Sequence, residues 1–150
     1  MTQIDEMGRR ILRELQRNGR LSNIDLADRV GLSPSACLRR VQELERRGVI
    51  RGYAARLDPA EMGRGYLVYV AVGLADHSKA AQARFEQAMA AADEVTECHN
   101  IAGVFEYLLR VETRDMAAYK RFHSDILGTV PGVRSITSHI VMGSPKDARG

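Results

Sequence analysis

Residues 33–47 combine arginines with small polar residues, and this stretch carries the clearest chemistry in the chain. Arginine presents a planar fork of N–H donors that fits two acceptors at once, on a phosphate or on the edge of a guanine. A helix over this stretch, at 100° per residue, would turn one set of side chains outward: Ser35, Ala36, Arg39, Gln42, Glu43 and Arg46, with Arg40 and Arg47 at the flanks. The expected chemistry is hydrogen bonding to nucleic acid.

The first turns of such a helix are the part that a DNA-reading helix places against base edges. We therefore predict base contacts from Ser35, Ala36 and Arg39, and the small size of the first two lets the helix approach closely. Phosphate contacts are predicted from Arg40 and Arg46. The free N–H groups at the start of the helix also suit a phosphate.

Local signals on either side predict a helix-turn-helix. Ser33 is a favoured N-cap and Pro34 a favoured first helical residue, and the Ser33 hydroxyl is also a candidate contact to DNA. Ser22, with Asp25 three residues later, resembles a capping box that opens the preceding helix. Gly31 stands where a left-handed residue ends that helix.

The inner sides of these helices predict one small core. Residues 4–17 repeat apolar positions at helical spacing, which indicates a further helix in front. In residues 33–47 the side opposite the arginines groups Cys37, Leu38, Val41, Leu44 and Glu45. A plain three-helix bundle whose charged face is merely solvated is the alternative that these patterns leave open.

The second half of the chain alternates strand and helix patterns. Strands are predicted over residues 66–75, 95–101, 105–113 and 133–142, and helices over residues 78–93 and 115–127. This β-α-β-β-α-β order is typical of the ferredoxin-like fold, so the predicted class is α+β with a helix-turn-helix domain in front. Two helices cover one sheet face, and the apolar first strand indicates that a partner buries the other, hence at least a dimer.

Glycine, proline and a shift in charge near residues 58–65 separate the halves. Residues 49–57 are predicted as a short strand, and residues 58–61 resemble a cap with one turn of helix. We therefore divide the chain into a helix-turn-helix DNA-binding domain with its linker strand at residues 1–57, a hinge at 58–65, and a ligand-sensing and oligomerisation domain at 66–150.

The net positive charge of the chain lies in its N-terminal 60 residues. Residues 1–60 hold 12 arginines, no lysine and 8 acidic residues, whereas residues 61–150 hold 10 basic and 11 acidic residues. The net charge of +3 for the whole chain is thus carried by the segment that holds the predicted recognition helix. GC-rich coding would also favour arginine over lysine, but it does not explain the asymmetry.

The cysteines and the apolar runs predict a reducing cytoplasm and no membrane span. Cys37 falls on an apolar helix side, which favours a buried thiol over a disulfide. The N-terminus is polar, and the longest apolar run, residues 66–75, is too short for a spanning helix. Cys98 and His99 are neighbours on a predicted strand and point to opposite faces, so no metal site is expected.

The motifs of both halves resemble the Lrp/AsnC (feast/famine) family of transcriptional regulators. The most specific stretch is VGLSPSACLRRVQELERRGVIRGY, and ECHNIAGVFEYLLRV, DMAAYKRF and VPGVRSITSHIVM resemble the second domain of that family. The resemblance covers residues 4–143. It implies a homodimer joined through the ferredoxin-like domains, often assembled into tetramers or octamers, with amino-acid effectors bound near the interfaces between dimers.

The same resemblance identifies a candidate effector turn. Family members carry Gly-Asp-aromatic-Asp-Tyr between the second and third strands, where this chain has Gly103, Val104, Phe105, Glu106 and Tyr107. A free amino acid needs an acceptor for its ammonium group and donors for its carboxylate. Glu106 is the predicted acceptor, and Gly103 is expected to adopt a turn conformation closed to other residues.

Donors for the effector carboxylate are predicted from backbone N–H groups near residues 102–105 and from the hydroxyl of Thr137 or Ser138. Val104 departs from the family pattern because it replaces an acid. This departure leaves open a different effector, a less polar one, or none. An ordinary hairpin turn with Glu106 in water is a further alternative.

These observations predict a sequence-specific DNA-binding transcriptional regulator. Its assembly or DNA affinity would change with a small molecule, with an amino acid as the first choice. The alternative is an amino-acid-sensing or architectural DNA-coating protein without locus-specific readout. A ferredoxin-like enzyme is disfavoured, since the sequence has no Ser/His/Asp grouping, phosphate-binding glycine loop or metal spacing, and no cofactor is expected.

Overall fold

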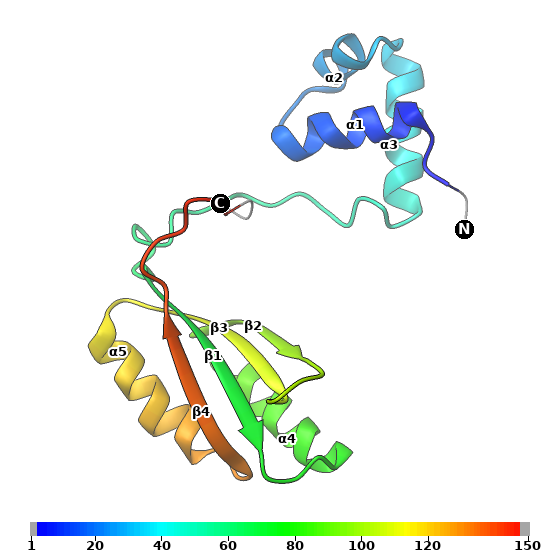
Figure 1. Cartoon of the computed structure of the whole chain (residues 1–150). Helices are drawn as coiled ribbons and strands as arrows, with labels where there is room; N and C mark the ends of the chain where they lie inside the picture. Colours follow the sequence, from blue (N-terminus) through cyan, green and yellow to red (C-terminus); the bar gives the residue numbers. More distant parts are fainter. Residues whose placement is uncertain (1–2, 148–150) are drawn as a thin grey trace. The chain divides into compact units, whose positions relative to one another are not determined.

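The computed structural model describes residues 3–147, which form two units divided after Ala55. Unit 1, residues 3–55, is helical, and unit 2, residues 56–147, is built on a sheet (Figure 1). The division falls two residues before the predicted end of the first domain. Within the described range, no helix is long and apolar enough to cross a membrane.

Unit 1 contains α1 (Glu6–Arg17), α2 (Asn23–Val30) and α3 (Pro34–Arg46). A tight turn joins α2 to α3, in which Gly31 takes the left-handed conformation at φ 73°. Gly31 therefore ends α2 where the sequence predicts. The order and bounds of these helices confirm the predicted helix-turn-helix.

Each helix of unit 1 begins at a side chain that accepts a backbone N–H. Asp5 accepts from Gly8 at 2.7 Å, and Ser22 and Ser33 cap α2 and α3 in the same way. Such a cap contributes about 1 kcal/mol because it satisfies an N–H group that the helix leaves free. The serine caps confirm the sequence predictions, whereas the Asp5 cap is not among them.

The core of unit 1 is small and aliphatic. Its buried residues are Ile11, Leu26, Ala27, Val30, Cys37 and Leu44. Leu38, predicted on the inner side of α3, is instead 46% exposed, because α1 and α2 cover only the stripe that contains Cys37 and Leu44. Glu45, grouped with that side, is exposed too, and it accepts a hydrogen bond from the Tyr53 hydroxyl at 2.9 Å.

The predicted strand over residues 49–57 does not form. A strand needs a neighbour to pair its N–H and C=O groups, and no strand in the described range pairs with this segment. The turn that follows does form. The Asp58 carboxylate accepts the N–H of Ala60 at 2.8 Å, and the N–H of Arg64 donates to the carbonyl of Pro59 at 2.6 Å.

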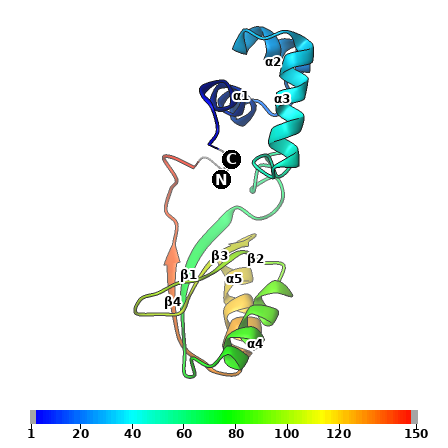
Figure 2. The same cartoon turned by 90° about the vertical axis from the view of Figure 1, so that its right-hand side faces the viewer.

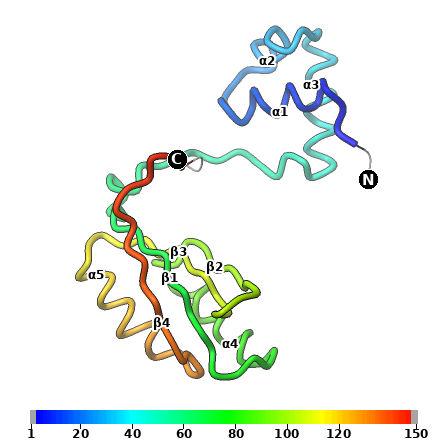
Figure 3. Tube along the Cα trace, viewed as in Figure 1, coloured from blue at the N-terminus to red at the C-terminus, as the bar shows by residue number. Residues whose placement is uncertain are grey.

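Unit 2 is an antiparallel sheet with strand order β2-β3-β1-β4. Its elements are β1 (Tyr66–Leu74), α4 (Lys79–Ala90), β2 (Val95–Asn100), β3 (Tyr107–Thr113), α5 (Met116–Arg121) and β4 (Val133–Ile140). Both helices lie on one face of the sheet (Figure 2), and the first and last strands run side by side (Figure 3). This arrangement confirms the predicted ferredoxin-like α+β fold.

The second helical segment of unit 2 is not the single helix predicted over residues 115–127. α5 ends at Arg121, a π-helical turn covers Phe122–Ile126, and a 3-10 turn covers Leu127–Thr129. Phe122 and Leu127 are both buried in the core. A π turn closes i→i+5 hydrogen bonds and so brings residues five apart onto nearly one face, which lets Phe122 and Leu127 both pack into the core.

The two faces of the sheet differ in cover. Along β3, every second residue from Tyr107 to Thr113 is buried against the helices. Leu108, Arg110 and Glu112 lie on the opposite face and are half-buried, and Arg110 forms an ion pair with Glu112. We call this second surface the open face. Within the described residues, no helix covers it.

Candidate nucleic-acid interface and ligand-binding turn

Hydrogen bonds of Ser33 and Asn23 hold the first turn of α3 in place. The Ser33 hydroxyl accepts the N–H of Ala36 at 3.3 Å and lies 3.3 Å from the Ser35 hydroxyl. The side-chain amide of Asn23, at the start of α2, donates to the carbonyl of Pro34 at 2.8 Å. These bonds fix the start of α3 against α2, which presets the direction in which its first turns point.

The predicted base-contacting residues share the exposed side of these turns. Ser35 and Arg39 are exposed, and Ala36 is partly exposed. Among residues 3–147, no acidic side chain pairs with Arg39. Its guanidinium therefore keeps all of its donors for an external acceptor.

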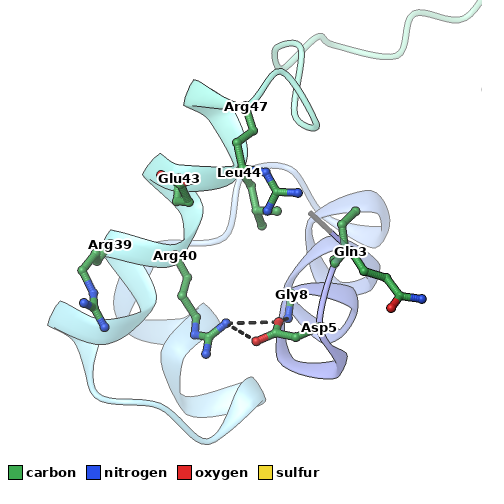
Figure 4. Close-up of a pocket in the computed structure, with 9 residues that line it drawn as sticks. Gln3, Asp5, Gly8, Arg39, Arg40, Glu43, Leu44 and Arg47 are labelled. Carbon is green, nitrogen blue, oxygen red and sulfur yellow. Dashed lines mark hydrogen bonds and ion pairs between the residues drawn. The ribbon is translucent and has the colours of Figure 1, made fainter. Parts of the chain in front are cut away.

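Arg40, a predicted phosphate contact, is engaged within unit 1. Its Nη1 donates to both carboxylate oxygens of Asp5, at 2.8 Å and 3.1 Å (Figure 4). The hydrogen bond from Arg40, followed by the N–H of Gly8, lowers the pKa of Asp5 below its usual value. Asp5 thus joins the start of α1 to the middle of α3.

Arg46, the second predicted phosphate contact, forms a two-pronged ion pair with Glu43, one turn earlier on α3, at 2.8 Å and 3.0 Å. The Arg46 side chain is largely exposed and the Glu43 side chain about half exposed. Exposed pairs of this kind are weak, so a phosphate can compete for Arg46. A hollow of about 550 Å³ lies beside α3 and is lined by Gln3, Ile4, Asp5, Gly8, Arg39, Arg40, Glu43, Leu44 and Arg47.

The candidate effector turn between β2 and β3 differs in one respect from its prediction. Gly103 does not adopt a positive φ, and a Cβ built on it would meet nothing within 4 Å. The expectation of a glycine-only conformation is therefore wrong, because the loop is open enough for a side chain. Val104 is fully exposed, and Phe105 is partly buried.

Glu106 is not in open water, as one alternative supposed. Its Oε2 accepts the N–H of Leu74 at 2.7 Å, and its Oε1 lies 3.2 Å from His77 Nδ1. The Glu106 side chain is 20% exposed. The carboxylate thus joins the end of β1 to the β2–β3 turn, and it retains lone pairs for a further donor.

Tyr107, the last residue of the candidate turn, belongs to the core. Its ring is fully buried against Phe85, and its hydroxyl donates to Glu86 at 2.6 Å. Burial, followed by the hydrogen bond to Glu86, raises the pKa of Tyr107 to about 12. This side chain faces α4 and not the turn.

Thr137 and Ser138 point to opposite faces of β4. The Ser138 hydroxyl shares a hydrogen bond with the Tyr119 hydroxyl on the helix side. Thr137 pairs with Ala71 in the register, and alternation puts it on the open face. The two hydroxyls therefore cannot serve one site together.

Sequence reasoning missed the residues that surround Glu106 on the open face. Gly73 pairs with Ser135, whose hydroxyl fills the space that a Cβ at Gly73 would need, and Glu106 Oε2 lies 3.6 Å from that same position. His77 is the third neighbour that was missed. Only the strand register brings these residues together, and no spacing in the sequence signals it.

Neither cysteine and none of the histidines forms a metal cluster in the described range, where no group of three or more metal-ligating side chains occurs. Cys37 is buried and Cys98 lies exposed on β2, and both are free thiols. Although the residue as a whole is exposed, the protein groups around its thiol partly exclude water, and this desolvation, with a smaller effect of Glu86, raises the pKa of Cys98 to about 11. Cys98 is thus a thiol and not a thiolate near neutral pH.

Two family models match the chain in the order of its two units. A winged helix-turn-helix DNA-binding model matches residues 4–51, and the Lrp/AsnC ligand binding domain model matches residues 67–150. The first match includes all of α1, α2 and α3. The second includes nearly the whole sheet and the candidate effector turn.

Similar proteins match over almost the whole length. The chain is 40% identical over 145 residues to the leucine-responsive regulatory protein of Escherichia coli strain K12, which covers 97% of this chain and 88% of that protein. A transcriptional regulator of Neisseria meningitidis, solved in complex with L-methionine, has a TM-score of 0.92 at 36% identity over 97% of this chain and 94% of that one. An AsnC family transcriptional regulator from Agrobacterium tumefaciens has a TM-score of 0.90 at 37% identity, over 95% and 93% of the two chains.

Proposed function

The chain belongs to the Lrp/AsnC family of DNA-binding transcriptional regulators, which are not enzymes, and we propose on this basis that unit 1 reads a specific duplex sequence while unit 2 assembles the protein and binds a free amino acid. The amino acid changes assembly or DNA affinity through its different affinity for two states of the protein. This regulation takes place in the cytoplasm and uses no cofactor.

The proposed reading surface is the outward side of α3. Arg39 contacts a guanine edge, with Ser35 and Ala36 beside it, whereas Arg40, Arg46 and the Ser33 hydroxyl contact the backbone. The single observation that carries this assignment is the exposed guanidinium of Arg39, which pairs with no acidic side chain among residues 3–147 and lies beside two small residues on the first turns of a firmly capped helix.

The proposed assembly is a homodimer joined through the open faces of two sheets, and dimers associate further into tetramers or octamers. The half-buried apolar and ion-paired residues of the open face support it, since a surface of this kind suits burial by a partner. Residues 58–65 act as the hinge between domains at residues 1–57 and 66–150. A two-fold dimer would read half-sites about one helical turn apart, ~34 Å, or a multiple of it.

The proposed effector is a free amino acid held at the turn that contains Glu106. The Neisseria meningitidis structure holds L-methionine, and the Escherichia coli relative is named for its response to leucine. Glu106 accepts the ammonium group, and backbone N–H groups of residues 102–105 with the Thr137 hydroxyl bind the carboxylate. Val104, which is fully exposed in place of an acid, favours an effector with an apolar side chain.

DNA reading is tested by selecting duplexes from a random pool and footprinting the protein on the recovered sequence. We expect a discrete protected segment with a recurring half-site spacing. Protection that spreads evenly along any duplex would instead support an architectural, sequence-blind coating protein.

Effector binding is tested by thermal shift with each of the twenty amino acids, because a ligand of the folded form raises the melting temperature. Calorimetry with the best ligand then compares Glu106→Gln with the control Glu61→Gln, an exposed acid of unit 2. Glutamine keeps an acceptor for the N–H of Leu74 but loses the charge. Only Glu106→Gln should abolish the binding heat, and an unchanged titration would remove Glu106 from the site.

A further inference from the structure

Asp5 makes more contacts than an N-cap requires. Its Oδ1 accepts a hydrogen bond from the N–H of Gly8, and both of its carboxylate oxygens accept hydrogen bonds from Nη1 of Arg40. Asp5 and Arg40 are 35 positions apart, and Asp5 caps α1 while Arg40 lies within α3. The Asp5 carboxylate therefore connects the first helix of unit 1 to the predicted recognition helix.

A cap alone does not call for a carboxylate. Serine, asparagine and aspartate cap helices about equally well, and α2 and α3 both begin at serines. A serine at position 5 would serve α1 in the same way, but it would offer Arg40 no charge. The negative charge of Asp5 thus acts on Arg40 and not on the helix end alone.

The ion pair leaves most of the Arg40 guanidinium available. Only Nη1 bonds to Asp5, and among residues 3–147 neither Nε nor Nη2 has a partner. A guanidinium carries five N–H donors, so the donors on Nε and Nη2 remain for an external acceptor. Figure 4 shows Arg40 turned toward Asp5 on the edge of the hollow beside α3, while Arg39 stays outside the pair.

We infer that Asp5 is a positioning residue for DNA binding, which holds Arg40 in the orientation in which its free edge meets a backbone phosphate. The inference rests on the proposed DNA-reading function of α3. An arginine held by a carboxylate has already lost its rotamer freedom, so contact with the phosphate costs less. Asp5 acts through Arg40 and does not itself touch DNA.

Whether removal of Asp5 raises or lowers DNA affinity distinguishes a positioning role from a purely electrostatic one. Removing an acid from a DNA-binding surface adds a unit of positive charge, which by itself strengthens phosphate binding. If Asp5 only competed with DNA for Arg40, its removal would also strengthen binding. Positioning predicts the opposite, a loss of affinity despite the added charge.

The test uses fluorescence anisotropy of the full-length protein on the duplex recovered by selection, across a salt series. Asp5→Ser keeps the cap and removes the charge, and Glu6→Gln is the matched control. Glu6 is the next residue, and its ion pair with Arg13 at 3.1 Å is exposed and does not involve Arg40. We expect Asp5→Ser to weaken binding about three- to fivefold and Glu6→Gln to leave it unchanged or slightly stronger.

The same measurement in an Arg40→Ala background shows whether Asp5 acts through Arg40. Positioning predicts that Asp5→Ser causes no further loss there, and at most the slight gain that follows from removing an acid. An equal loss in both backgrounds would mean that Asp5 merely stabilises α1 and would overturn the inference. Wild-type or tighter binding by Asp5→Ser would overturn it as well. Circular dichroism checks the fold, and Asp5→Asn, which also caps, replaces Asp5→Ser if the serine variant loses helix.

Failure of the proposed function gives a different result. A wild-type protein that binds all duplexes alike would refute sequence reading, yet the comparison of Asp5→Ser with Glu6→Gln would still report whether Asp5 positions Arg40 on a phosphate. Sequence-specific wild-type binding with no loss in Asp5→Ser would refute the positioning role alone.

Discussion

Unit 1 and unit 2 place their functional side chains by different means. In unit 1 the predicted reading residues lie on one helix, and the cap at Ser33, two to six residues before them, sets their direction. In unit 2 the candidate ligand group, Glu106, lies in the β2–β3 turn and is held by the N–H of Leu74, 32 residues earlier at the end of β1. Local sequence rules suffice for the first arrangement, and strand register is needed for the second.

The hydrophobic cores of the two units also differ in composition. Unit 1 packs aliphatic side chains of three short helices, whereas unit 2 packs Phe85 against Tyr107 at 4.6 Å between ring centres and encloses Phe122. Each core forms within its own unit. A change in one core should therefore spare the other unit, which makes the comparison testable.

The largest expected effects come from truncation of each core. Phe85→Ala in unit 2 and Ile11→Ala in unit 1 should each lower the free energy of unfolding by about 2–5 kcal/mol, because each leaves a cavity where a fully buried side chain stood. Amide hydrogen exchange resolved by residue measures the loss. Each variant should weaken protection in its own unit, and equal losses in both units would show that they unfold together.

Removing the long-range contact between Glu106 and Leu74 in unit 2 should lower the free energy of unfolding by a smaller amount. Glu106→Ala removes the acceptor of the Leu74 N–H and should destabilise unit 2 by about 1–3 kcal/mol. Urea denaturation followed by circular dichroism measures the change. Glu106→Gln is the control, since it retains an acceptor and should recover most of the loss. Equal destabilisation by both variants would mean that the charge, and not the hydrogen bond, stabilises this end of the sheet.

Removing the local N-cap contact of α3 should lower the free energy of unfolding of unit 1 by a smaller amount. Ser33→Ala removes the cap of α3 and should destabilise unit 1 by about 1 kcal/mol. Ser33→Asn restores an N-cap and should recover most of this stability. Thermal unfolding followed at helix wavelengths reports the result, and a neutral Ser33→Ala would show that packing alone sets the start of α3.

Acid should produce the smallest effect, through different carboxylates in the two units. A hydrogen bond from Arg40 lowers the pKa of Asp5, and the N–H of Ala118 does so for Asp115. A lowered pKa in the folded state means that the stabilisation is complete above the ordinary value near 3.8 and is lost as the pH falls below it. Asp5→Asn should therefore flatten the acid dependence of unit 1 stability and leave that of unit 2 unchanged.

The difference between the units also decides what the sequence can predict. The serine caps, the left-handed Gly31 and the exposed Arg39 follow from local rules, and the structure has all three as predicted. Local rules do not predict the exposure of Leu38, because that exposure depends on how much of α3 the neighbouring helices cover.

In unit 2 the order of strands and helices follows from periodicity, but the site does not. Thr137 and Ser138 face opposite sides of β4, and the contact of Glu106 with His77 depends on strand pairing between distant segments. The unpaired segment at residues 49–57 fails as a strand for the same reason, since pairing requires a partner that its own sequence cannot specify.

The most direct test of the account is the affinity of Arg39→Ala for the selected duplex and for single-base variants of it, with Arg134→Ala in β4 as a control of equal charge. The account predicts that Arg39→Ala loses about tenfold or more in affinity for the selected sequence and no longer discriminates at one base pair, with assembly unchanged by light scattering. Arg134→Ala should retain the base preference. If Arg39→Ala binds the selected duplex with undiminished affinity and selectivity, the outward side of α3 does not read DNA.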